Sequence, residues 1–188
     1  KRLGLSSTSE IYEARHLESG KHVAIKRALP HAWEDPAHRA RFDREIALVM
    51  QQTHPGLVRG LDVVMAPSIT ERSGDPCLVM HFVEGTSLRA LLDCVGVTTP
   101  PEAALVHAAM TLAESLSALH AAADHPIVHG DLSAGNVLVD RDGTFTVLDL
   151  GSAAPQGEPS TDLGTPRYTP PERQPGAPLT TTGDVYSL

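Results

Sequence analysis

Among the polar residues of this 188-residue chain, five are candidates for chemistry on phosphate groups. They are one lysine, three carboxylates and one amide: Lys26, Glu45, Asp131, Asn136 and Asp149. A lysine can neutralise phosphate charge, and carboxylate and amide oxygens are ligands that suit Mg²⁺. Each residue also has an ordinary alternative, because a lysine at a strand end is usually solvated and an aspartate is common in turns. The pattern in which they occur therefore has to decide.

The order of short strings along the chain favours the chemical interpretation. In order, they are a Gly/Ser turn from Gly4, Val23-Ala24-Ile25-Lys26, Glu45, His129-Gly130-Asp131, Asn136, Asp149-Leu150-Gly151 and Pro170-Pro171-Glu172. In this order the strings resemble the signatures of eukaryotic-type serine/threonine protein kinases. The resemblance covers the chain from Gly4 to Leu188.

The resemblance implies transfer of the γ-phosphate of ATP to Ser or Thr hydroxyls of a protein substrate. Lys26 would hold the α- and β-phosphates, and Glu45 would pair with Lys26 to keep its ammonium in place. Asp131 would orient the substrate hydroxyl, while Asn136 and Asp149 would bind the metal. ATP and Mg²⁺ are therefore the expected cofactors, and a protein with a Ser/Thr acceptor is the expected partner.

Glu45 has a competitor on the same predicted helix. Asp43 also flanks the apolar stripe, so helical periodicity does not choose between the two, and either could lie on a solvated face. The string from Arg41 to Ile46 matches the family at Glu45. We therefore expect Glu45 to be the partner of Lys26.

The resemblance further implies an apolar adenine pocket. Ile11 and Ala24 would lie above the base and Leu138 below it, with Met80 at the back. The backbone of His81 and Val83 would offer hydrogen bonds, and Ser87 lies where the family often contacts the ribose. Plain core packing would give the same apolar residues, so the sequence leaves that alternative open.

The sequence departs from the family pattern in three features: the glycine-rich loop, the residue before Asp131 and the residue two after it. Gly4, Ser6 and Ser9 stand in place of three loop glycines, so side chains could crowd the phosphates and weaken nucleotide handling. Gly130 replaces the usual Arg, which removes the customary partner of a phosphorylated activation loop and makes regulation by loop phosphorylation less expected. Ser133 replaces a lysine that would touch the transferred phosphoryl group.

The string Gly164-Thr165-Pro166-Arg167-Tyr168-Thr169-Pro170-Pro171-Glu172 still resembles the serine/threonine class. In that class the residue at Thr165 bonds to the catalytic aspartate, here Asp131. The Asp-x-Ser loop is similar to variants among bacterial members, which suggests a bacterial cytoplasmic kinase.

Two other functions stay open at this point. A pseudokinase would keep the fold and bind nucleotide or a partner protein with little turnover, as the altered loop and the missing lysine suggest. A small-molecule phosphotransferase is prompted by His-Gly-Asp-Leu-x-x-Gly-Asn, a string that such enzymes share. The long loop after Asp149 that ends in Gly-Thr-Pro-x-Tyr and Pro-Pro-Glu favours a protein kinase.

These residues require an α+β, bilobal protein-kinase-like fold. Residues 1–85 are expected to form a nucleotide-binding lobe, a small antiparallel sheet with one helix, which Asp35 would cap and Pro36 would begin. Strands are expected at 23–26, 57–64 and 77–83, followed by a linker at 84–87.

Residues 86–188 are expected to form a mainly helical catalytic lobe that is incomplete. A long helix should follow Pro101, because apolar residues recur at helical spacing from Leu105 to Leu119. Residues 137–139 and 145–148 should form a hairpin with Gly143 in its turn, and residues 151–182 an extended loop before a helix from Asp184. Both ends of the sequence look excised, since it starts with Lys1 and stops within a helical pattern.

Composition excludes several classes of function. The formal charge is −8 and no run of Lys or Arg occurs, so nucleic acid is not expected as a partner. No stretch reaches the roughly 18 apolar residues of a membrane span, although an anchor could lie outside these residues. Cys77 and Cys94 have apolar surroundings and are expected in the core of a protein from a reducing compartment. Pro126 prevents His125 and His129 from sharing a helical face as a metal pair.

Overall fold

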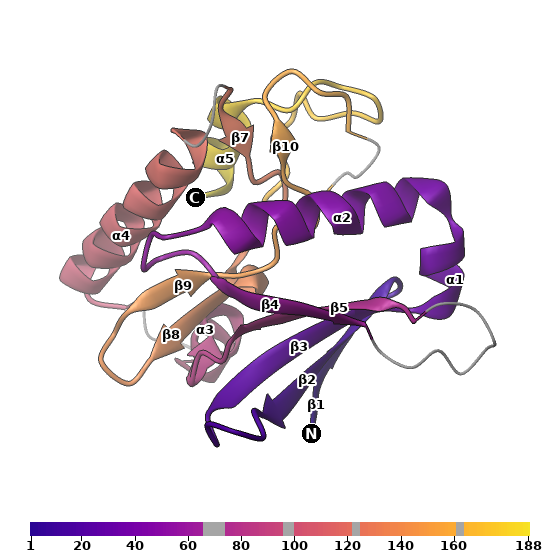
Figure 1. Ribbon diagram of the computed structural model, residues 1–188. Coiled ribbons are helices and arrows are strands. Elements are labelled where there is room, and N and C mark those ends of the chain that lie inside the picture. The colour runs from indigo at the N-terminus through magenta and orange to yellow at the C-terminus, as the bar shows by residue number, and fades with distance from the viewer. Residues whose placement is uncertain (66–73, 96–99, 122–124, 161–163) are drawn as a thin grey trace. The chain divides into compact units, whose positions relative to one another are not determined.

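The structure is a computed structural model that describes residues 1–65, 74–95, 100–121, 125–160 and 164–188 (Figure 1). Much of the predicted polar stretch from Pro67 to Pro76 lies outside the described residues. The chain divides into two compact units. Unit 1 comprises Lys1–Thr53 and Val58–Val83, and unit 2 comprises His54–Leu57 and Glu84–Leu188. The elements confirm the predicted α+β class. The functions expected of residues 1–85 and 86–188 stay predictions.

Unit 1 contains a five-stranded antiparallel sheet. Its strands are β1 (Arg2–Leu5), β2 (Ser9–Arg15), β3 (His22–Ala28), β4 (Gly60–Met65) and β5 (Pro76–His81), in the order β1-β2-β3-β5-β4. The register places Lys26 opposite Ile11 and Leu78, and Ala24 opposite Met80. Since cross-strand partners share a face and side chains alternate along a strand, Ile11, Ala24, Lys26 and Met80 lie on one face of this sheet.

Two helices accompany the sheet, where the sequence predicted one. The short helix α1 (Pro30–Glu34) precedes α2 (Pro36–Gln51), and Asp35 separates them with extended backbone angles. Pro36 disfavours a helical conformation at the residue before it, which explains the break. The Asp35 carboxylate accepts a hydrogen bond from the Ala37 N–H at 2.8 Å, so the predicted cap of α2 is confirmed.

Unit 2 contains a three-stranded sheet. Its strands are β6 (Gly85–Ser87), β8 (Val137–Asp140) and β9 (Phe145–Val147), with β8 in the middle. The predicted hairpin is confirmed, and Gly143 in its turn has φ +80°, a conformation that favours glycine. Residues 84–87 are not a plain linker as expected, because β6 pairs with β8 and places Ser87 opposite Leu138.

Helix α4 (Glu102–His120) confirms the long helix predicted after Pro101, and buries Leu112, Leu116 and Leu119. The two-turn helix α3 (Leu88–Val95) was not predicted. It exposes Cys94, which contradicts the expected core position, whereas Cys77 is buried as expected. A two-turn helix can leave part of its last turn in solvent even where the neighbouring residues in the sequence are mostly apolar.

The rest of unit 2 consists of short strands, a 3₁₀ turn, a short helix and the loop segments between them. They are β7 (Ile127–Val128), the 3₁₀ turn η1 (Ala134–Asn136), β10 (Ala154–Pro155), paired with β7, and α5 (Thr181–Ser187). Val128, Ala154 and Leu179 form a buried cluster that joins the loop to β7. Helix α5 begins at Thr181 rather than at the predicted Asp184, because the Thr180 hydroxyl accepts a hydrogen bond from the Gly183 N–H and caps it.

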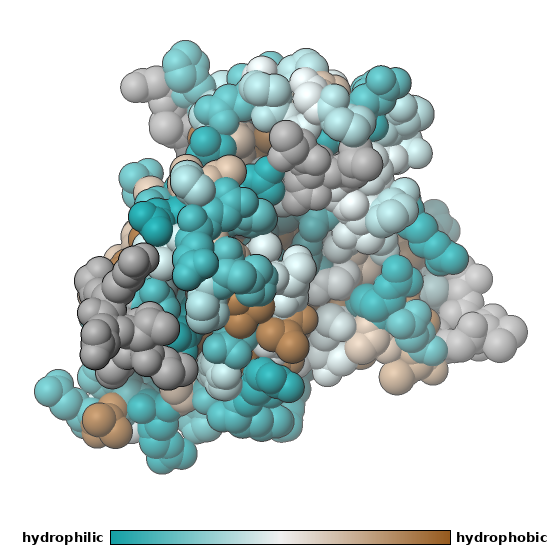
Figure 2. Space-filling model, turned by 90° about the vertical axis from the view of Figure 1, so that its right-hand side faces the viewer, coloured by the Kyte–Doolittle hydropathy of each residue, from teal (hydrophilic) through white to brown (hydrophobic). Residues whose placement is uncertain are grey.

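One face of the molecule is shown by hydropathy in Figure 2. The face in Figure 2 is mostly hydrophilic, with hydrophobic residues in small groups. Within the part of the chain that the structure describes, no helix has both the length and the apolar character needed to cross a membrane.

We predict that Asp35→Ala lowers the thermal unfolding temperature, whereas Asp35→Asn keeps it close to that of the parent at pH 7, because asparagine can also cap a helix. The Ala37 N–H and the His38 side chain lower the pKa of Asp35 from 3.8. The charged cap is thus complete above that pH and is lost as the pH falls through the lowered pKa. Unfolding temperatures of the three proteins between pH 7 and pH 3 test this. Asparagine should escape the acid loss, and equal acid profiles for parent and Asn variant would contradict the prediction.

Candidate active site

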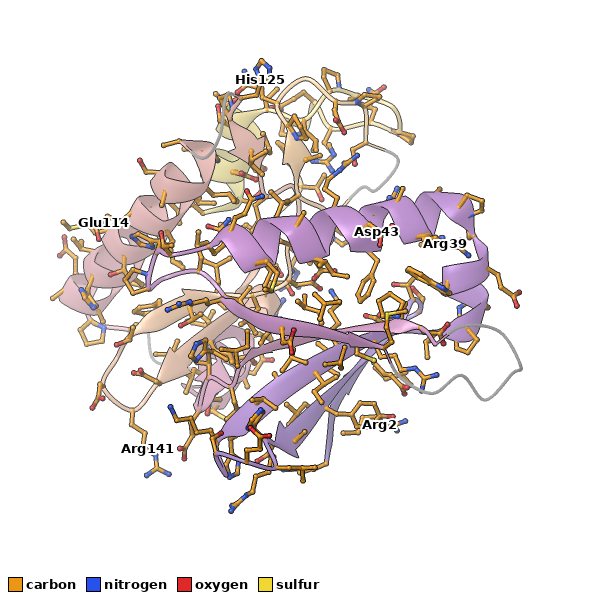
Figure 3. All side chains as sticks on the ribbon, viewed as in Figure 1. Arg2, Arg39, Asp43, Glu114, His125 and Arg141 are labelled. Carbon is orange, nitrogen blue, oxygen red and sulfur yellow. The ribbon has the colours of Figure 1, made fainter. Side chains whose placement is uncertain are left out.

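A buried ion pair joins β3 to α2 within unit 1. The Lys26 Nζ lies 2.6 Å from Glu45 Oε1, and the two side chains are 6% and 3% exposed. Charges removed from water this far are tolerated when they are paired. Asp43, the alternative partner, is exposed on α2 (Figure 3). The structure therefore contains the ion pair that the family pattern favoured.

The other residues of unit 1 that were predicted to contact the nucleotide lie in or next to the strands of its sheet. Gly4 lies in β1, Ser6 in the turn and Ser9 at the start of β2. Among the backbone groups expected to face adenine, the His81 N–H donates to the Arg59 carbonyl at 3.0 Å. That N–H is therefore bonded to the residue directly before β4. Val83 lies two residues beyond the end of β5.

The carboxylate of Asp131 is held in place by Thr165, a residue of the loop after Asp149. Its Oδ1 accepts hydrogen bonds from the backbone N–H of Thr165 at 2.7 Å and from the Thr165 hydroxyl at 2.8 Å. Gly164 precedes this contact with φ +69°, and a Cβ there would lie 3.2 Å from Asp131 Oδ1. A glycine at this position thus lets the loop backbone approach the carboxylate closely.

Asn136 lies against the same aspartate. Its Nδ2 donates to the Asp131 carbonyl at 2.8 Å and lies 3.4 Å from Asp131 Oδ2. Because the amide nitrogen is directed at Asp131, the amide oxygen points the other way. This fixed orientation presents an oxygen of the type that Mg²⁺ accepts.

Asp149 follows β9 and Leu148 with φ +50°, and it is the non-glycine residue with positive φ in the described part of the chain. Its Oδ1 accepts a hydrogen bond from the Gly151 N–H at 3.1 Å. Positive φ costs free energy for a residue with a side chain and recurs at functional sites. The bond to Gly151 closes a local Asx turn that holds the carboxylate in one orientation.

Ser133 and Gly130 are uncharged residues at two positions where the family usually has cations. Ser133 is buried, and its carbonyl accepts from the Asn136 N–H at 2.9 Å, which closes η1. Gly130 has φ +76°, and a Cβ there would lie 3.0 Å from the Ser152 carbonyl oxygen. The local backbone therefore fits glycine at this position.

His129 has structural contacts through both ring nitrogens. Its Nδ1 accepts from the Asp131 N–H, and its Nε2 lies 3.3 Å from the Leu148 carbonyl. It is fully buried. Through these contacts, His129 connects the backbone at Asp131 to Leu148, the residue directly after β9.

Asp184 is the residue whose role sequence reasoning missed. It is 1% exposed, and its carboxylate accepts hydrogen bonds from the backbone N–H groups of His129 at 2.7 Å and Gly130 at 2.9 Å. The His120 Nε2 lies 2.8 Å from the same carboxylate. An acidic residue at the start of a helical pattern was the only signal, and it suggested a helix start rather than an anchor.

Unit 1 thus assembles Lys26 and Glu45 beside the sheet face that carries Ile11, Ala24 and Met80. In unit 2, the residues brought together are Asp131, Asn136 and Thr165, with Leu138 and Ser87 opposite each other on neighbouring strands. The Ser87 hydroxyl accepts from the Ala90 N–H at 3.2 Å, so it also starts α3.

Unit 1 thus contains a lysine paired with a carboxylate of α2, and unit 2 contains a loop with oxygen acceptors held by Gly164 and Thr165. Phosphoryl transfer uses groups of both kinds. The chain belongs to the protein kinase family, since the model of the protein kinase domain matches residues 1–188.

Curated relatives agree with this class. The chain is 33% identical to the DNA damage-responsive serine/threonine-protein kinase RqkA of Deinococcus radiodurans, over 99% of the chain and 27% of the relative. It is 30% identical to the serine/threonine-protein kinase PknB of Mycolicibacterium smegmatis and 34% identical to PknH of Mycobacterium bovis, in each case over 99% of the chain and 30% of the relative. The chain therefore spans less than a third of the length of these relatives.

We predict that Gly130→Ala destabilises the protein by about 1–3 kcal/mol, because alanine disfavours positive φ and its Cβ would crowd the Ser152 carbonyl. Gly143→Ala is the matched control: its φ is +80°, yet nothing lies within 4 Å of the added Cβ. Chemical denaturation of both variants should show the larger loss for Gly130→Ala. An equal loss would mean that the contact with Ser152 contributes nothing.

Proposed function

We propose that this chain is the catalytic part of a serine/threonine protein kinase that transfers the γ-phosphate of Mg-ATP to hydroxyl groups of a protein substrate. The observation that carries the proposal is the double hydrogen bond from Thr165 to Asp131. It joins the expected catalytic carboxylate to the loop string that separates protein kinases from small-molecule phosphotransferases.

Each candidate residue has a physical task in this proposal. Lys26, kept in place by Glu45, would neutralise the α- and β-phosphates. Asp131 would accept a hydrogen bond from the substrate hydroxyl and align it with the γ-phosphorus. Thr165 holds Oδ1 of Asp131, so the carboxylate can keep one orientation while the hydroxyl is aligned. Apolar Ile11, Ala24, Met80 and Leu138 would enclose the adenine, and Ser87 would contact the ribose.

Asn136 and Asp149 fit a magnesium site. The outward amide oxygen of Asn136 and the fixed carboxylate of Asp149 are oxygen donors of the right kind. Bound Mg²⁺ would neutralise phosphate charge. The chain's part is to hold these two oxygens through Asp131 and Gly151.

A second candidate, a nucleotide-binding pseudokinase, is favoured by one specific observation. Ser133 is neutral and buried where the family has a lysine near the transferred phosphoryl group. Electrostatic stabilisation of the transition state is therefore reduced by one cation. The first prediction below separates the two candidates.

We predict that the full-length protein transfers labelled γ-phosphate from Mg-ATP to a generic protein acceptor and that Asp131→Ala lowers the rate about 10²- to 10⁴-fold, since it removes the group that aligns the hydroxyl. Nucleotide affinity should change little. Transfer rates and ATP binding of both proteins are the measurements. Equal transfer by both would contradict the role of Asp131, and no transfer by either with binding intact would establish the pseudokinase.

We predict that Thr165→Val lowers kcat about ten- to a hundredfold, because it removes a hydrogen bond to a charged carboxylate without changing the side-chain shape. Thr165→Ser, which keeps the hydroxyl, is the matched control and should retain most of the activity. Steady-state kinetics with a protein acceptor test this. Similar kcat values for the Val and Ser variants would show that the hydroxyl does not position Asp131.

A further inference from the structure

The turn between β1 and β2 is closed by the Ser6 N–H, which donates to the Ser9 carbonyl at 2.8 Å, and by the Ser6 side chain. The Ser6 Oγ accepts hydrogen bonds from the Thr8 N–H at 3.2 Å and the Ser9 N–H at 2.9 Å. It also lies 3.1 Å from both the carbonyl and the hydroxyl oxygen of Ser9. A glycine at position 6 could form none of these side-chain contacts.

The same turn is also bonded to Leu29, directly before α1, and to His31 within α1. The His31 Nε2 lies 2.8 Å from the Ser7 carbonyl, and the Leu29 N–H donates to the Thr8 carbonyl at 2.8 Å. The Ser7 and Thr8 carbonyls are therefore bonded outside the turn, while the Thr8 and Ser9 N–H groups converge on the Ser6 hydroxyl. Successive N–H groups that converge on one point form a concave site of the kind that binds anions.

In the proposed kinase, this turn is the loop that covers the phosphates of ATP. A phosphate oxygen and a serine hydroxyl oxygen are both acceptors, and each N–H group can direct one strong hydrogen bond. A phosphate that binds the Thr8 and Ser9 N–H groups must therefore displace the Ser6 hydroxyl from them.

We propose that Ser6 is an internal competitor of the nucleotide: its hydroxyl occupies the two loop N–H groups that a phosphate would otherwise bind. This inference rests on the proposed function and assigns one residue to the weakening of phosphate binding at that site. The competition acts on the phosphates and leaves the adenosine part of the ligand unaffected, because Ser6 touches only the turn.

The test is calorimetric titration of the full-length protein with two ligands, the Mg²⁺ complex of the non-hydrolysable ATP analogue AMP-PNP and adenosine. Ser6→Ala should bind the analogue about three- to tenfold more tightly, as expected from the loss of one or two competing neutral hydrogen bonds. Adenosine affinity should stay unchanged. Ser6→Thr, which keeps a hydroxyl, should resemble the parent, and so should Ser7→Ala, whose hydroxyl forms none of the bonds described above.

Analogue binding by Ser6→Ala that is equal to or weaker than that of the parent, with adenosine binding unchanged, would overturn the inference alone. Ser6→Gly gives the same decision should the alanine variant fail to fold, because it also removes the hydroxyl. A parent protein that is folded but binds neither ligand would overturn the proposed function, and this inference with it.

Discussion

The buried carboxylate of Asp184 is the constraint on which the catalytic loop depends. It accepts the backbone N–H groups of His129 and Gly130, the two residues directly before Asp131. A buried carboxylate must be surrounded by donors, and two amides and His120 meet that requirement here. The position of Asp131 therefore follows from a helix that begins 50 residues later in the chain. The loop is held by its backbone, so its side chains can serve other tasks.

The Lys26–Glu45 pair has the same role for unit 1. Burial of either charge alone would leave it uncompensated, at a cost of about 3–5 kcal/mol. Each charge therefore stabilises the position of the other and joins β3 to α2. The Asp35 cap and Pro36 fix where α2 begins, and this start sets which helical face carries Glu45 toward the sheet. Local helix chemistry thus positions a charge that lies ten residues further along.

The sequence allowed prediction wherever the physical cause was local. The leucine spacing of α4, the glycine of the β8–β9 turn and the Asp-Pro start of α2 each depend on neighbouring residues alone. Asp184 could not be assigned, because its partners lie 54 to 64 residues away. Glu45 was chosen over Asp43 by its motif, since helical spacing gives both a flank of the apolar stripe.

The errors have physical causes as well. Strand β6 is three residues long, and its pairing with β8 depends on tertiary context rather than on its own composition. Helix α3 is two turns long, too short for periodicity to stand out, and so the exposure of Cys94 was not foreseen.

Hydrogen bonds order the loop after Asp149 within its described residues. Gly130 stands where the family usually has an arginine, so this position supplies no cation to that loop. Instead, the Gly157 N–H donates to the Leu179 carbonyl and the Leu179 N–H donates to the Glu158 carbonyl, both at 2.9 Å. The Arg173 Nη2 lies 3.0 Å from the Ser160 hydroxyl.

Backbone hydrogen bonds of this kind form without any covalent modification. The two hydrogen bonds from Thr165 to Asp131 also need no modification, because they join a backbone amide and a free hydroxyl to a carboxylate. The loss of the family's arginine at Gly130 is therefore compatible with an ordered site. In the proposed kinase, transition-state charge would be left to Lys26 and to bound Mg²⁺, since Ser133 adds no cation. The altered positions would then bear on the rate of transfer and on nucleotide affinity more than on the geometry of Asp131.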